Sequence, residues 1–181
     1  MSFSLSNQGI MFHYDDPKID QIEIVDVAHA LSNICRFGGH TERFYSVAEH
    51  SVLCSELVAP KFALSALLHD AHEAYVLDVP TPLKRMMPQY MEIERRFEIT
   101  LRQKFGVPVE LSPAVKKADA QALWIERYQL LPPHDGWWEK PEDLVLPERK
   151  LSCYPPHIAK AVFLQRFYDL VNNVQVRGDR V

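Results

Sequence analysis

The chain has 181 residues, of which 47% are hydrophobic and 24% are charged. These proportions are those of an ordinary globular protein, and the length suits one well-buried domain, which we expect to span residues 1–181. The net charge of −4 argues against a partner that is a nucleic-acid polymer, because such proteins need a basic surface to displace phosphate counterions.

The same sequence argues against export and membrane insertion. No apolar run approaches the ~20 residues that a membrane span requires, and residues 1–16 lack the regions of a signal peptide. Cys35, Cys54 and Cys153 are scattered and form no C-x-x-C pair, so they indicate neither a disulfide framework nor a thiolate metal site. We therefore expect a soluble, cytoplasmic protein with no membrane partner.

Apolar residues recur with helical spacing along most of the chain. The predicted helices cover residues 24–37, 46–58, 61–76, 89–106, 112–131 and 157–171. Asp26, Ser46 and Ser112 are the predicted N-caps of three of them, and Gly106 is the predicted end of a fourth. Residues 9–14 and the start of 22–26 are compatible with short strands.

Two proline-rich stretches are predicted as loops. One covers residues 77–88, and the other covers residues 132–156, which hold six of the thirteen prolines. The whole pattern predicts an all-α fold, a compact bundle of about six helices with no internal repeat.

The stretch "LLHDAHEAY" at residues 67–75 combines an apolar segment with clustered polar side chains. In a continuous helix, the spacing of four would place His69 and Glu73 on one face, with Asp70 on the same side. Buried carboxylates cost several kcal/mol unless they are paired or bind a metal. An adjacent histidine and aspartate suit Zn²⁺, Mn²⁺, Co²⁺ or Fe²⁺.

A metal needs more than two ligands, and two other predicted helices offer them. His50 and Asp119 both lie mid-helix beside apolar positions. A metal site in the bundle core is therefore predicted from His50, His69, Asp70 and Asp119. His72 is a further candidate ligand, although we favour a role behind the ligands or at the surface.

Five short motifs in this order resemble the HD-domain metal-dependent phosphohydrolases, and most closely their small 5′-deoxynucleotidase branch. They are Arg36-Phe37, "VAEHS" (47–51), "HDAHE" (69–73), "DVPTPLK" (78–84) and "KKAD" (116–119). The resemblance covers roughly residues 26–125, and its N-terminal half is similar to the dATP triphosphohydrolases of phages.

This resemblance implies an HD-domain fold and a divalent ion (Zn, Co, Mn or Mg) on the four ligands named above. It implies that Glu73 orients or deprotonates the attacking water and that Asp78 assists near the leaving group. The implied substrate contacts are Arg36, Lys84 and Lys116 to phosphate and Phe37 to the sugar or base. Without the resemblance, both lysines could be ordinary surface residues and Phe37 could belong to the core.

The activity that the resemblance implies is hydrolysis of deoxynucleotides, with dATP as the favoured substrate. The products would be deoxyadenosine and either triphosphate or phosphates released stepwise. Two alternatives stay open, a 5′-deoxynucleotidase acting on deoxynucleoside monophosphates and a catalytically silent HD-fold binding module. His40 could contact a base or phosphate or cap its turn. The resemblance also implies a homo-oligomer, either a dimer or a dimer-based hexamer.

Overall fold

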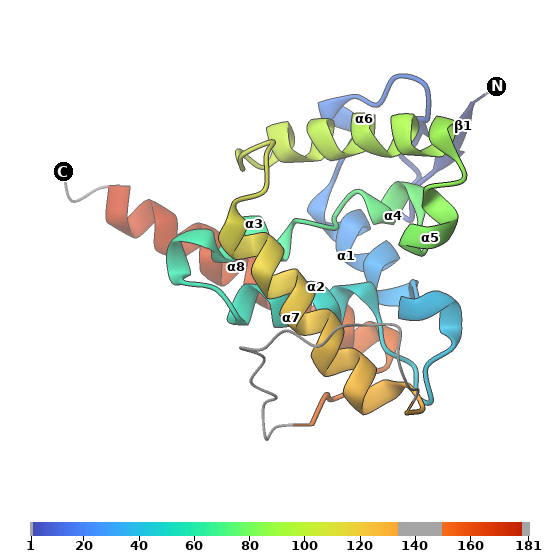
Figure 1. The fold of residues 1–181 in the computed structure, drawn as a ribbon. Coiled ribbons are helices and arrows are strands. Elements are labelled where there is room, and N and C mark those ends of the chain that lie inside the picture. The colour runs from blue at the N-terminus through green and yellow to red at the C-terminus, as the bar shows by residue number, and fades with distance from the viewer. Residues whose placement is uncertain (1, 134–149, 179–181) are drawn as a thin grey trace.

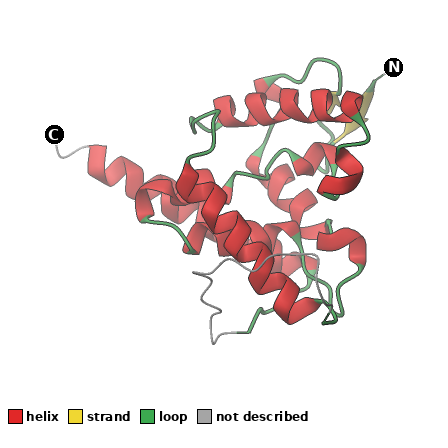
Figure 2. Cartoon of the chain, viewed as in Figure 1, coloured by secondary structure: helices red, strands yellow, loops and turns green. Residues whose placement is uncertain are grey.

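The computed structural model describes residues 2–133 and 150–178, and within them nearly all regular structure is helical (Figure 2). The prediction of an all-α fold is confirmed. The helices are α1 (Ile24–Asn33), α2 (Val47–Glu56), α3 (Ala63–Leu67), α4 (Glu73–Val76), α5 (Thr81–Lys84), α6 (Pro88–Lys104), α7 (Pro113–Leu130) and α8 (Pro156–Gly178). The described residues also form three short 3₁₀ turns: η1 (Ile19–Gln21) precedes α1, η2 (Arg36–Gly39) follows α1, and η3 (Pro60–Phe62) precedes α3. None of the described helices is long and apolar enough to cross a bilayer.

Helix ends follow the predicted caps with one exception. The Ser46 hydroxyl accepts a hydrogen bond from the Glu49 N–H, and Gly106 follows α6 with a φ of 65°. The Ser112 hydroxyl caps α7 in the same way as Ser46 caps α2. Asp26 as an N-cap is wrong, because α1 begins at Ile24 and Asp26 lies inside it, where its carboxylate accepts the Gln8 N–H at 3.0 Å.

The predicted helix at 61–76 is interrupted. α3 ends at Leu67 and α4 begins at Glu73, and the backbone N–H of Glu73 bonds to the Asp70 carbonyl three residues earlier. His69 and Asp70 therefore lie in the turn between these two helices, and Glu73 begins the second one. The expectation that His69 and Glu73 share one helix face is therefore wrong.

The strand and loop predictions are met in part. Residues 9–14 contain β2 (Met11–His13), which pairs antiparallel with an unpredicted strand, β1 (Phe3–Leu5). The stretch 22–26 is not a strand, because α1 starts within it. The predicted loop at 77–88 contains α5. Most of the predicted loop at 132–156 lies outside the described residues.

The core forms where α1, α2 and α8 pack against one another, with α7 crossing α2 and α3 (Figure 1). An aromatic cluster fixes the position of α4. The ring of Tyr75 lies 4.9 Å from that of Phe12 on β2 and 5.1 Å from that of Phe97 on α6. Because α4 begins at Glu73, this cluster also fixes the backbone of that residue. A second, smaller apolar cluster joins α2, α3 and α7 around Cys54, Ala66, Val115 and Ala122.

Candidate metal centre

Three packed segments bring the predicted ligands together. His50 lies on α2, His69 and Asp70 lie in the turn between α3 and α4, and Asp119 lies on α7. α2 packs against both α3 and α7 (Figure 1). The segments are far apart in sequence, so the fold itself assembles the cluster.

Each histidine of the cluster lies beside both aspartates. His50 Nε2 is 3.3 Å from Asp70 Oδ2 and 3.2 Å from Asp119 Oδ1. His69 Nε2 is 3.1 Å and 3.7 Å from the same two oxygens. Ligands about 2.1 Å from a tetrahedral ion are separated from one another by about 3.4 Å. The four histidine–aspartate distances are therefore close to the separation of two ligands on one ion.

Hydrogen bonds on the far side of each ring leave Nε2 free for an ion. Glu126 Oε1 lies 2.6 Å from Nδ1 of His50, and the Ala66 carbonyl oxygen lies 2.8 Å from Nδ1 of His69. Carboxylate and carbonyl oxygens only accept, so both Nδ1 atoms carry the proton in these bonds. Metal-binding histidines have the same arrangement. His69 Nε2 is buried and has no hydrogen-bond partner among the described residues.

The cluster concentrates negative charge around the two imidazoles. Burial alone lowers the pKa of His69, but the charges of Asp70 and Cys54 and the contacts with Asp119 and Asp70 together outweigh that effect and raise the pKa well above its usual range. Burial works against ionisation of Asp70, yet His69 and His50 keep the pKa of Asp70 well below its usual range. Such mutual stabilisation shows a site that favours a cation, either protons on the rings or a metal ion.

The donor set fits a divalent ion of the zinc and cobalt class. It offers two imidazole nitrogens and two carboxylate oxygens, which are the ligand types that Zn²⁺, Co²⁺ and Mn²⁺ share. The side chain of Asp119 is 45% exposed, while His50 is fully buried. The cluster is therefore open on the Asp119 side and closed behind His50.

Of the two predicted catalytic carboxylates, Glu73 lies beside the predicted ligand Asp70. Ligand oxygens or nitrogens of Asp70, His72 and Glu73 lie within 4.8 Å of one another. One Glu73 oxygen is buried without a hydrogen-bond partner among the described residues. Burial, followed by the charges of Asp70 and Asp78, raises the pKa of Glu73 well above its usual range. Burial also raises the pKa of Asp78.

A chain of ion pairs links the centre to Asp78. Glu126 Oε2 lies 3.3 Å from a guanidinium nitrogen of Arg36, and another nitrogen of Arg36 lies 3.2 Å from Asp78 Oδ2. Arg36 is buried. In this conformation the predicted phosphate contact Arg36 is thus occupied by two carboxylates.

The remaining predicted contacts are placed as follows. The Lys84 ammonium is paired with Glu94, which also lies 3.3 Å from His72 Nε2. Lys116 is exposed on α7, one turn before Asp119. Phe37 is half-buried, and the Arg36 guanidinium lies 5.5 Å from its ring centroid.

Position 40 closes the turn that follows Phe37. His40 is exposed, and its backbone N–H donates to the Phe37 carbonyl.

Sequence reasoning missed two residues of the centre. Glu126 is fully buried and lies seven residues after Asp119, which puts both on one face of α7. The sequence feature that could have indicated Glu126 is this seven-residue spacing from Asp119, together with its position among the apolar residues Ala122 and Ile125. Cys54 lies one turn after His50 on α2, with Sγ 3.6 Å from His50 Nε2.

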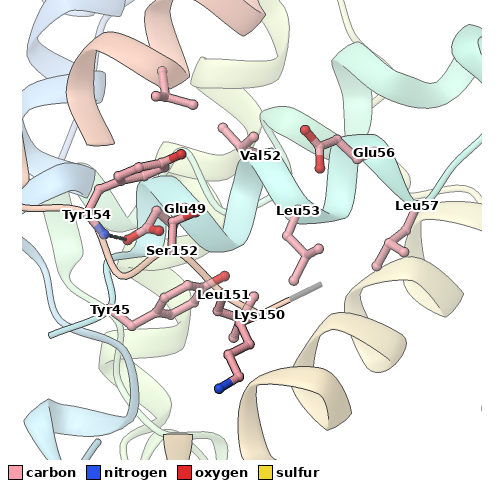
Figure 3. Close-up of a pocket in the computed structure, with 11 residues that line it drawn as sticks. Tyr45, Glu49, Val52, Leu53, Glu56, Leu57, Lys150, Leu151, Ser152 and Tyr154 are labelled. Atoms are coloured by element: carbon pink, nitrogen blue, oxygen red, sulfur yellow. Dashed lines mark hydrogen bonds between the residues drawn. The ribbon is translucent and has the colours of Figure 1, made fainter. Parts of the chain in front are cut away.

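A separate cavity of about 220 Å³ lies beside another part of α2 (Figure 3). Its described lining includes Tyr45, Glu49, Leu53 and Tyr154, and none of the four predicted ligands. Figure 3 shows Glu49 accepting the backbone N–H of Tyr154 there, at 2.9 Å. This cavity is therefore distinct from the candidate metal centre.

Two relatives span nearly the whole chain. It is 44% identical over 172 residues to the uncharacterised protein YfdR of Escherichia coli K12, and the match covers 94% of this chain and 96% of YfdR. The chain belongs to the YfdR family. An uncharacterised protein of Rhodobacter capsulatus is 32% identical over 177 residues, covering 88% of this chain and 90% of that protein. No family model matches the chain.

Proposed function

We propose that the protein is a divalent-metal-dependent phosphohydrolase of deoxynucleotides, with dATP as the favoured substrate. The proposal depends on one observation above all, the convergence of two imidazole nitrogens and two carboxylate oxygens at 3.1 to 3.7 Å, with the Glu73 carboxylate beside Asp70. The YfdR relatives are uncharacterised, so the activity is inferred from the site and from the motif resemblance.

Glu73 is the proposed general base. A bound divalent ion lowers the pKa of water and offsets phosphate charge. Glu73 would then accept the proton of the attacking water, because one of its oxygens is buried without a hydrogen-bond partner among the described residues and lies beside Asp70. The aromatic cluster around Tyr75 keeps the start of α4 in place for this transfer.

Asp78 is the proposed proton donor to the leaving oxygen. Its pKa is raised by burial, which favours the protonated form that a general acid requires. Arg36 holds Asp78 at 3.2 Å and so orients it toward the centre. When a phosphate enters, its oxygens would compete with Asp78 for the same guanidinium.

Phosphate binding is assigned to Arg36, Lys84 and Lys116, with Phe37 against the sugar or base. The ammonium of Lys84 must leave Glu94 to reach a substrate. Phe37, Gly38 and Gly39 all have positive φ, so the backbone forms a tight left-handed turn that allows close approach of a ligand. This turn lies next to Arg36 and supports a nucleoside pocket there.

Product analysis by anion-exchange chromatography tests the proposal. Protein loaded with Co²⁺ or Mn²⁺ is offered the four deoxynucleoside triphosphates and the four monophosphates separately. Deoxyadenosine from dATP alone is the expected result. Nucleosides from monophosphates alone would replace the proposal with a 5′-deoxynucleotidase, and inertness toward all eight would favour a silent binding module.

A pair of variants ties any activity to the centre. Asp70→Ala should lose both the metal and the activity, whereas Asp20→Ala, an exposed aspartate remote from the ligands in sequence, should keep both.

The same preparations test the proposed homo-oligomer by light scattering, with a dimer or a dimer-based hexamer expected. Such an enzyme would act on the nucleotide pool of the cytoplasm.

A further inference from the structure

Cys54 lies at the metal centre although its sequence context gave no sign of a role there. It is fully buried on α2, one helical turn after His50, and both side chains point to the same side of that helix. Its Sγ lies 3.6 Å from Nε2 of His50 and 4.0 Å from Nδ1. The sulfur therefore approaches the nitrogen that faces the ion site.

This approach has the geometry of two ligands on one ion. With bonds of about 2.3 Å to sulfur and about 2.1 Å to nitrogen, a tetrahedral ion separates the two atoms by about 3.6 Å. Donor atoms of His50, Cys54, His69 and Asp119 all lie within 4.8 Å of one another. Asp70 is not a member of that set, although its carboxylate lies 3.3 Å from His50 Nε2 and 3.1 Å from His69 Nε2.

A second observation points to a ligand at the same place. His69 Nε2 is buried, and in the described parts of the chain it meets the Asp70 carboxylate at 3.1 Å without a hydrogen bond of normal geometry. A buried polar atom left in this state costs free energy unless a ligand satisfies it. Cys54 also packs with Ala66, Val115 and Ala122. Apolar packing alone would not explain why the buried Nε2 of His69 lacks a hydrogen bond.

We propose that Cys54 is a further ligand of the divalent ion, grouped with His50, His69 and Asp119 and additional to Asp70. The inference rests on the proposed metal site and goes beyond the four ligands predicted from sequence. As the sulfur–metal bond forms, the thiol proton passes to water, since a coordinating thiol is deprotonated. A thiolate selects softer ions, so Zn²⁺ and Co²⁺ should bind far more tightly than Mg²⁺ or Mn²⁺.

Absorption of the Co²⁺-loaded full-length protein tests the assignment without reference to activity. The visible d–d bands report that cobalt is bound, and a near-ultraviolet sulfur-to-cobalt charge-transfer band reports a thiolate ligand. The wild type should show both. Cys54→Ser should lose the charge-transfer band and bind Co²⁺ about 10- to 100-fold more weakly. Cys35→Ser, a control at a half-buried cysteine, should keep the band.

The outcomes separate this inference from the proposed function. Visible bands without a charge-transfer band in the wild type would overturn the role of Cys54 and leave the metal site standing. The absence of both bands would overturn the metal site itself. Retention of the charge-transfer band in Cys54→Ser or Cys54→Ala would assign the sulfur to another cysteine. Since the wild-type spectrum is decisive, the test does not depend on how well a variant folds.

Discussion

Glu126 accepts a hydrogen bond from Nδ1 of His50 at 2.6 Å, and neither side chain has any exposed surface. The other oxygen of Glu126 meets Arg36 at 3.3 Å. One buried carboxylate on α7 therefore sets the tautomer of a predicted ligand on α2 and holds the arginine that reaches Asp78. Ligand, arginine and proposed acid form one connected network.

Glu126→Gln should weaken metal binding by about 10- to 100-fold, the usual cost of losing such a partner of a metal-binding histidine. The amide keeps the shape but loses the charge, so Nδ1 of His50 is bound less firmly and Arg36 loses a counter-ion. Isothermal titration with Zn²⁺ or Co²⁺ measures the effect. Glu110→Gln, at an exposed glutamate, is the control. Equal affinities in the wild type and Glu126→Gln would show that Glu126 does not act on the ligand.

The same substitution should also lower stability. Arg36 would keep Asp78 at 3.2 Å as a partner, so the loss should stay below the about 3 to 5 kcal/mol that a fully unpaired buried charge costs. Chemical unfolding of the metal-free protein separates this effect from ligand binding. A Glu126→Gln protein as stable as the wild type would mean that water enters and compensates the arginine.

Glu73→Gln should keep the metal and lose turnover. The amide cannot accept the proton of water, and removal of a general base costs typically 10² to 10⁴ in rate. Metal content by elemental analysis and kcat on the substrate found by product analysis are the two measurements. Glu92→Gln, which changes an exposed glutamate on α6, is the control. A Glu73→Gln enzyme with near-wild-type kcat would remove Glu73 from the mechanism.

The all-α fold class could be predicted from the sequence because helical spacing and capping residues are local signals. Ser46, Ser112 and Gly106 mark helix ends through contacts within a few residues, so their roles could be recognised without the structure. The four predicted ligands do lie together, although their binding of a metal stays a prediction. Their convergence was inferred because His50 and Asp119 lie beside apolar positions of predicted helices and because the His69–Asp70 pair follows an apolar segment.

Non-local features could not be predicted in this way. The helix ends at Leu67, although apolar residues continue with helical spacing beyond that point. The sequence pattern therefore did not indicate the interruption. Glu126 resembles any mid-helix glutamate until α2 is seen to bury it against His50. The pairing of Lys84 with Glu94 joins α5 to α6, and sequence gives no sign of it.

Leu77 stores backbone strain beside Asp78. Its φ of 74° and ψ of 159° fall close to a region occupied essentially by glycine alone, at a cost of about 1 to 3 kcal/mol. The Tyr90 hydroxyl lies 3.0 Å from the Leu77 carbonyl and helps to hold this conformation. Because the Leu77 side chain is 61% exposed, Leu77→Gly should raise the melting temperature while loosening Asp78 and lowering turnover.

The control for Leu77→Gly is Leu83→Gly. Leu83 is also exposed but lies in α5, where glycine costs about 1 kcal/mol, so this variant should melt at a lower temperature than the wild type. Thermal unfolding followed by circular dichroism compares the two. If both variants lost stability equally, the backbone at Leu77 would not be strained.

Glu49 should make stability depend on pH. Burial beside the cavity raises the pKa of Glu49 from 4.5 to about 7 in the folded protein. The folded state therefore binds more protons than the unfolded state between these values, and stability falls as pH rises from about 4.5 to about 7.

Glu49→Gln should remove this dependence. The amide oxygen can still accept the Tyr154 N–H (Figure 3), but it carries no charge to bury. The variant should match the wild type near pH 4 and exceed its unfolding free energy by about 1 to 2 kcal/mol at pH 8, a value reduced for solvent screening. Urea unfolding across this pH range is the measurement, with Glu56→Gln, exposed on the same helix, as the control. Parallel stability profiles for Glu49→Gln and the wild type would show that Glu49 is already ionised, and solvated, at neutral pH.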